Sequence, residues 1–110
     1  MSKSRFDRVQ ASENCRMRAL ELLDAGHTEN AVVGLRCAVE CNPRNSKAWN
    51  DLGVVMETLG YPQEAVRCYR RAIALEPGRS EASQNLGMLL MQFGMAQALQ
   101  RQAFTSSMAF

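Results

Sequence analysis

The middle of the chain carries apolar side chains in a pattern typical of two helices joined by a turn. From Ser46 to Arg79 these residues recur over successive helical turns. They are Trp49, Leu52, Gly53, Met56, Ala65, Tyr69 and Ala72. Gly60 separates the two halves and gives the backbone freedom for a turn. Pro62 follows it and suits the first position of a helix, where a missing N–H costs little.

The sizes of these residues predict close packing between the two helices. Trp49 provides a bulky anchor, and Gly53 leaves room one turn later for the partner helix to approach. The second helix alternates small and large residues around Tyr69. Pro77 ends the unit, because a proline inside a helix costs about 3 kcal/mol.

This segment resembles the tetratricopeptide repeat family, whose signature reads W-x2-L-G-x2-Y…A-x3-F…P. The residues that carry the resemblance are Trp49, Leu52, Gly53, Met56, Gly60, Ala65, Tyr69, Ala72 and Pro77. The resemblance implies an all-α fold, an α-solenoid of antiparallel helix–turn–helix repeats, and a role in binding other proteins.

The pattern recurs on both sides of this unit. The preceding window, residues 12–45, keeps the small residues and the proline but holds Cys15 and Arg18 at the Trp and Leu places. The following window matches through Gly94, then has Leu99 and Ala103 at unexpected places and no closing proline. We therefore predict repeats at 12–45 and 46–79, a divergent or shortened third at 80–110, and a helical extension over 1–11. This organisation contains about six to seven helices.

Length and composition agree with a single helical domain. The chain has 110 residues, no period-two alternation of β-branched residues, and three prolines that fall at predicted helix starts or ends. Repeat arrays of this kind need about three units for stability. This chain is therefore at the minimum size for its predicted fold.

The charge balance does not indicate a nucleic-acid surface, and we expect no nucleic-acid partner. Thirteen basic and eleven acidic residues give a net charge of +2, and Arg67, Arg70 and Arg71 are interleaved with Glu64 and Glu76. This pattern is typical of a solvated helix face. No apolar run has the length of a signal peptide core or a membrane span, so we expect a cytoplasmic protein without membrane insertion.

The cysteines and the single histidine offer little for catalysis or metal binding. Cys37 and Cys41 lie four apart on one predicted helix, but a closed zinc site needs four ligands and His27 falls in the preceding turn. Cys15 replaces the anchor tryptophan, so we expect it to be buried. We expect reduced thiols, no metal, no cofactor and no enzyme activity, since no nucleophile has an adjacent base and orienting group.

The resemblance also implies where a partner binds, because the first helices of such repeats line a concave groove. The predicted groove residues are Arg16, Leu20, Leu23, Lys47, Asn50, Val54, Glu57, Gln84, Met88 and Met91. One row, Leu20, Val54 and Met88, is apolar in all three repeats, and polar rows that include Thr58 and Gln92 flank it. Such a stripe suits an amphipathic helix or an extended peptide of another protein. The alternative is that these residues only complete the core.

One known use of the family is not expected. Chaperone-binding members hold a peptide's C-terminal carboxylate with a clamp of Lys, Asn, Asn, Lys and Arg. The corresponding places here hold Arg16, Leu20, Asp51, Glu81 and Asn85. Only Arg16 fits this role, and Glu81 would repel a carboxylate.

The C-terminal third supplies a second hypothesis for function. Arrays normally end in a cap with a polar outer face, whereas the segment from Phe104 to Phe110 ends in apolar residues. It is a degenerate closing helix, a self-associating surface that makes homo-oligomers, or part of a longer tetratricopeptide-containing protein. At the other end, Phe6 and Val9 have helical spacing, and Phe6 is a candidate to pack against or cap the array.

Overall fold

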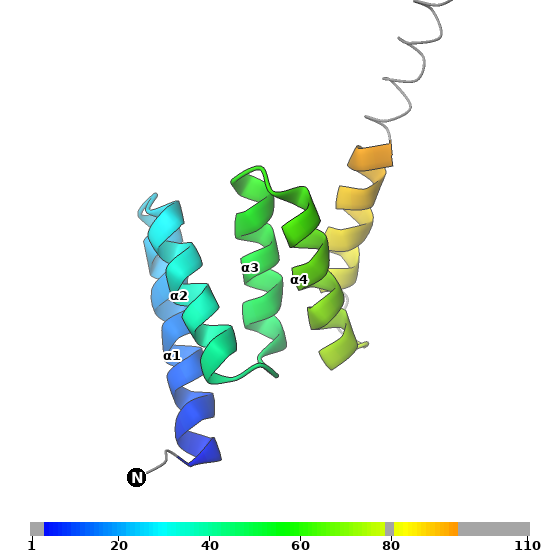
Figure 1. Ribbon diagram of the computed structural model, residues 1–110. Coiled ribbons are helices and arrows are strands. Elements are labelled where there is room, and N and C mark those ends of the chain that lie inside the picture. Colours follow the sequence, from blue (N-terminus) through cyan, green and yellow to red (C-terminus); the bar gives the residue numbers. More distant parts are fainter. Residues whose placement is uncertain (1–3, 79–80, 95–110) are drawn as a thin grey trace, which may run out of the picture.

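The computed structural model describes residues 4–78 and 81–94, which form helices and short turns without a strand (Figure 1). The helices are α1 (Arg5–Asp24), α2 (Thr28–Cys41), α3 (Ser46–Thr58) and α4 (Pro62–Leu75), followed by helical residues 81–94. α1 packs on α2, α3 packs on α4, and α2 joins the two pairs through α3. The all-α prediction is confirmed. None of the described helices has the length and apolarity needed to cross a bilayer.

The expected number of helices was wrong. The described residues contain five, not six to seven. The N-terminal extension is not a separate helix, because no glycine or proline interrupts the chain between Arg5 and Asp24 and α1 runs through without a break. The remaining expected helix falls on residues 95–110, outside the described residues. The limits of the three repeats stay a prediction.

Both helix pairs turn on the same backbone motif, 34 residues apart. Gly26 and Gly60 have φ angles of 86° and 89°, which a side chain would disfavour. His27 N–H bonds to the Leu22 carbonyl at 2.8 Å, and Tyr61 N–H repeats this bond to Met56 at 2.8 Å. With the inner bonds from the two glycines, these form Schellman motifs that satisfy the last helical carbonyls. Identical turns give the two pairs the same antiparallel form.

The α3–α4 pair is held at close range by one glycine and one tyrosine. A Cβ placed on Gly53 would lie 2.5 Å from Cε1 and 2.7 Å from Cδ1 of Tyr69. Tyr69 is fully buried, and its hydroxyl donates a hydrogen bond of 2.9 Å to the Glu57 carboxylate. The predicted small–large contact between these helices is therefore present.

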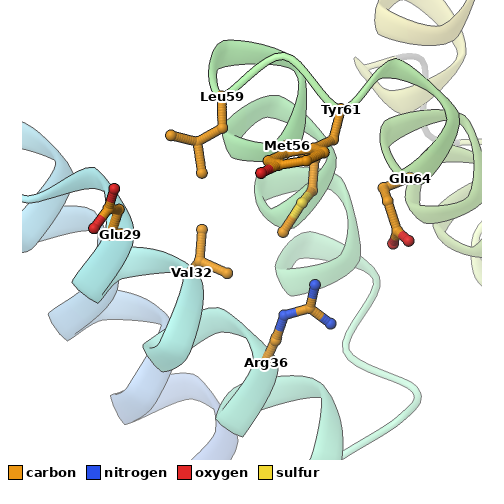
Figure 2. A pocket seen from close by; sticks show the side chains of 7 residues that line it. All are labelled: Glu29, Val32, Arg36, Met56, Leu59, Tyr61 and Glu64. Atoms are coloured by element: carbon orange, nitrogen blue, oxygen red, sulfur yellow. The ribbon is translucent and has the colours of Figure 1, made fainter.

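A single apolar core runs through all the described helices. It contains Ala19 of α1, Leu35 of α2, Val55 of α3 and Leu89 of residues 81–94, together with the α4 face around Tyr69. The pairs stack on this core and leave a hollow of about 320 Å³ at their junction (Figure 2). Its lining residues, none of them expected from the sequence as a site, are Glu29, Val32, Arg36, Met56, Leu59, Tyr61 and Glu64.

We predict that Gly53→Ala lowers the free energy of unfolding by about 1–3 kcal/mol, because the new methyl group overpacks against the Tyr69 ring. Gly87→Ala is the matched control, since a Cβ there meets nothing within 4 Å in the described structure. It should leave stability unchanged or raise it by up to about 1 kcal/mol through helix propensity. Urea unfolding measures both. Equal effects at the two positions would contradict the close packing at Gly53.

We predict that stability falls at alkaline pH. Burial raises the pKa of Cys68 to about 11, and burial together with the bond to Glu57 raises the pKa of Tyr69. Both groups are neutral in the fold, so their contribution is fully present below the unfolded pKa and is lost as pH rises from about 9 toward 11. The urea midpoint should drop over this range less steeply for Cys68→Ala than for the parent. Parallel profiles for the two proteins would refute this assignment.

Candidate partner-binding surface

The predicted apolar row is exposed at its centre and toward residues 81–94. Val54 on α3 is 39% exposed, Met88 is 61% exposed and Met91 is 67% exposed. Leu20 and Leu23 of α1 are half-buried, and Leu23 packs against the core. We name the side of α1, α3 and residues 81–94 that carries Leu20, Val54 and Met88 the inner face.

A shallow hollow lies on the inner face between α3 and residues 81–94. It has a volume of about 290 Å³. Its lining residues are Val54, Glu57, Thr58, Asn85, Met88 and Gln92. Two helices therefore bring two exposed apolar side chains, Val54 and Met88, to one site with polar groups around them. Met91 and Gln84 lie on the same helix as Met88, are exposed, and do not line this hollow.

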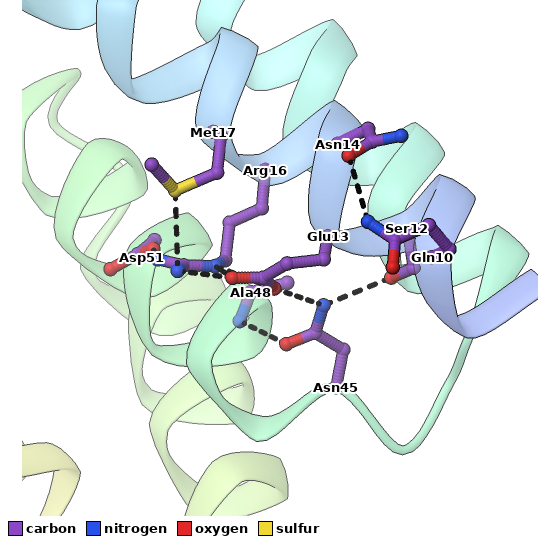
Figure 3. Close-up of polar contacts among 9 residues, drawn as sticks. All are labelled: Gln10, Ser12, Glu13, Asn14, Arg16, Met17, Asn45, Ala48 and Asp51. Atoms are coloured by element: carbon purple, nitrogen blue, oxygen red, sulfur yellow. Dashed lines mark hydrogen bonds and ion pairs between the residues drawn. The ribbon is translucent and has the colours of Figure 1, made fainter.

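Arg16, a predicted groove residue, is occupied by intramolecular ion pairs (Figure 3). Its Nε donates to both carboxylate oxygens of Glu13, at 3.1 and 3.0 Å, and its Nη1 lies 2.9 Å from Asp51 Oδ2. The Asp51 bond joins α1 to α3, and the side chains of both partners are mostly buried. Arg16 thus fixes the two inner helices together, and its charge is neutralised within the protein.

The two acids that share Arg16 have opposite pKa shifts. The hydrogen bond from Arg16 lowers the pKa of Glu13. Burial, together with the nearby charges of Glu81 and Glu13, raises the pKa of Asp51 despite the opposing contribution of Arg16. Bonding to Glu13 in turn raises the pKa of Arg16 and keeps it charged. The Asp51 carboxylate therefore depends on Arg16, because it lies in a poorly solvated place between helices.

Two other predicted groove residues also bond within the molecule. Asn50 is only 3% exposed; it donates to Glu81 at 3.1 Å and accepts a bond from Asn85 at 3.0 Å. Glu57 accepts the Tyr69 hydroxyl. Asn50 therefore serves to connect α3 to residues 81–94, and Lys47 remains as an exposed cation on this side.

Asn45 is a structural residue that the sequence reasoning missed. Its side-chain oxygen accepts the Ala48 N–H at 3.1 Å and caps α3, while its amide donates to Ser12 at 2.9 Å and Glu13 at 3.3 Å (Figure 3). Asparagine directly before a helix is a favoured N-cap, so the capping role could have been predicted. The link to α1 could not, because it depends on how the pairs stack.

Comparison with known proteins identifies the repeat. Residues 46–79 match the tetratricopeptide repeat family. The chain carries a tetratricopeptide repeat. Among curated protein sequences, none matches this chain.

Solved structures show the same tetratricopeptide fold over most of the chain. The second TPR of Spaghetti (RPAP3), bound to the HSP90 peptide SRMEEVD, is similar with a TM-score of 0.76 and 16% identity, over 90% of this chain and 92% of that chain. MamA is similar with a TM-score of 0.74 and 20% identity, over 90% of this chain and 63% of that chain. PilF from Pseudomonas aeruginosa is similar with a TM-score of 0.73 and 28% identity, over 94% of this chain and 46% of that chain. This chain thus spans less than two thirds of MamA and of PilF.

We predict that Arg16→Met lowers the free energy of unfolding by about 1–3 kcal/mol, because it leaves the half-buried Asp51 carboxylate without its partner. Arg67→Met is the matched control, since Arg67 pairs with Glu64 at 3.6 Å but is 78% exposed. The change there should be within about 0.5 kcal/mol. Urea unfolding of both variants tests this. If Arg16→Met lowers the free energy of unfolding no more than Arg67→Met does, the ion pair between α1 and α3 does not stabilise the fold.

Proposed function

We propose that this chain is a protein-interaction module whose inner face binds an amphipathic helix or extended peptide of another protein. The observation that carries the proposal is the exposure of Val54 and Met88, which line one hollow from two different helices. Apolar side chains left in water on two neighbouring helices favour a partner that covers them. The residues proposed to build this surface, as frame or as contacts, are Arg16, Leu20, Leu23, Lys47, Asn50, Val54, Glu57, Gln84, Met88 and Met91.

The residues of this surface divide into a frame and contacts. Arg16, Asn50 and Glu57 are already bonded within the protein, so they hold the helices and shape the hollow's edge. Val54 and Met88 then supply exposed apolar area in the hollow that binding would bury. Methionine is flexible and polarisable, which suits a surface that adapts to its ligand.

The charges of the inner face favour a partner with basic flanks. Glu57 lines the hollow, Glu81 lies beside Asn50, and Asp51 neutralises Arg16. A peptide's C-terminal carboxylate would meet these acids without a free cation at the Arg16 place. We therefore infer a segment that presents apolar anchors next to Lys or Arg, unlike the acidic peptide on the RPAP3 repeat.

A self-associating scaffold is the second candidate function. Phe6 on the first turns of α1 is 74% exposed, and it does not cap the array as one expectation had it. The other surface in that hypothesis, Phe104 to Phe110, lies outside the described residues. Under either candidate we propose no enzymatic activity and a cytoplasmic location, where the four thiols stay reduced.

We predict that Val54→Glu and Met88→Glu each abolish capture of a partner from the native cell extract, because a charge placed in the hollow must be desolvated on binding. Val33→Glu is the matched control: Val33 is 68% exposed on α2, away from the inner face. Affinity purification with quantitative mass spectrometry compares the parent and the three variants.

The outcome separates the candidate functions. A protein that is captured by the parent and by Val33→Glu but lost with both inner-face variants supports partner binding at the inner face. Capture unchanged in Val54→Glu and Met88→Glu, or recovery of only further copies of the chain, would contradict it and favour the scaffold.

A further inference from the structure

Three cysteines that lie apart in the sequence come together between α1 and α2. Cys15 of α1 and Cys37 and Cys41 of α2 have their Sγ atoms within 4.8 Å of one another. The Cys15 and Cys37 sulfurs are 3.7 Å apart. The sequence places only Cys37 and Cys41 together, because it gives no direct sign that Cys15 faces the same side of the pair.

We propose that Cys15, Cys37 and Cys41 form a binding site for one thiophilic metal ion of the Zn²⁺ class. Zinc–thiolate bonds are about 2.3 Å long, so two sulfurs on a tetrahedral ion lie about 3.8 Å apart. The Cys15–Cys37 separation meets this value with the side chains as they stand. Small movements of Cys41 complete a three-sulfur site.

The exposure of the three residues suits an ion that enters from solvent. Cys37 is exposed, while Cys15 and Cys41 are half-buried, contrary to the expectation that Cys15 would be buried like a core anchor. Three protein ligands leave a fourth position of a tetrahedral ion for water or for an atom of a bound molecule. Each thiol gives its proton to solvent as its sulfur coordinates the ion, and no oxidant is needed.

A comparison of the two helix pairs shows that a metal here would provide a contact between α1 and α2 that α3 and α4 make in another way. One period later, the places of Cys15 and Cys37 hold Trp49 and Arg71, and the Arg71 guanidinium lies 5.6 Å from the Trp49 ring centroid. Trp49 also donates to the Pro43 carbonyl at 2.8 Å. The α3–α4 pair is thus joined at this place by an aromatic contact that the α1–α2 pair lacks. A metal held by three thiolates would join α1 to α2 instead.

The test is a Co²⁺ titration of the full chain without an affinity tag, reduced with a phosphine and kept anaerobic. Binding should saturate at one Co²⁺ per chain with thiolate-to-cobalt charge-transfer absorption, which Zn²⁺ then abolishes by displacement. Cys15→Ser, Cys37→Ser and Cys41→Ser should each weaken binding about tenfold or more, since losing a ligand costs at least as much as losing a group that hydrogen-bonds to one. Cys68→Ala, which removes a buried thiol on α4 outside the cluster, should bind like the parent.

Two further measurements test the metal site without the serine variants, in case one of these folds poorly. X-ray absorption of the parent loaded with Zn²⁺ should count three sulfurs around the metal. Zn²⁺ should raise the melting temperature of the parent and of Cys68→Ala, since it binds only the folded cluster. No saturable absorption, fewer than three sulfurs, or unchanged binding in Cys15→Ser would overturn the site. Formation of a Cys15–Cys37 disulfide in air without metal binding under reduction would overturn it as well.

Discussion

The contact between Gly53 and the Tyr69 ring sets the geometry on which the rest of the structure depends. Without a side chain at Gly53, α4 approaches α3 closely enough to bury Tyr69 fully. This contact occupies the side of α3 that faces α4. Val54, the next residue, is rotated about 100° around the helix from it and remains exposed. The hydroxyl of Tyr69 also holds Glu57 at the edge of the inner hollow. One packing contact thereby connects the core of the repeat to its proposed binding surface.

The inner face combines two kinds of residue with different physical roles. Polar side chains join consecutive first helices: Arg16 bonds Asp51, and Asn50 bonds Glu81. The Arg16–Asp51 pair lies mostly out of solvent, and Asn50 is buried although Glu81 is exposed. Leaving a buried partner unpaired is costly, so these bonds fix how the helices stack. Apolar side chains next to them remain exposed. Such a rigid polar frame would lower the cost of ordering the surface when a partner covers its apolar residues.

The sequence predicted the fold better than it predicted the site. Glycine and proline at Gly60 and Pro62 mark a turn through local backbone physics alone, and the structure has it there. The exposure of Val54 likewise follows from helical periodicity. The burial of Asn50 and the pairing of Arg16 with Asp51 depend on contacts between helices more than 30 residues apart, which no local pattern encodes. The convergence of the three thiols likewise depends on a contact between two helices, with Cys15 and Cys37 22 residues apart.

The central claim is that the inner face of α1, α3 and residues 81–94 receives the partner, and mapping NMR chemical shifts onto the folded chain tests it most directly. The backbone amides and side-chain methyl groups of the isotope-labelled chain would be followed while the partner's binding segment is added. The account predicts the largest changes at Leu20, Val54 and Met88, with α2 and the outer side of α4 little changed. Chemical-shift changes centred on α2 and α4, with the shifts of the Val54 and Met88 methyl groups unchanged, would contradict it.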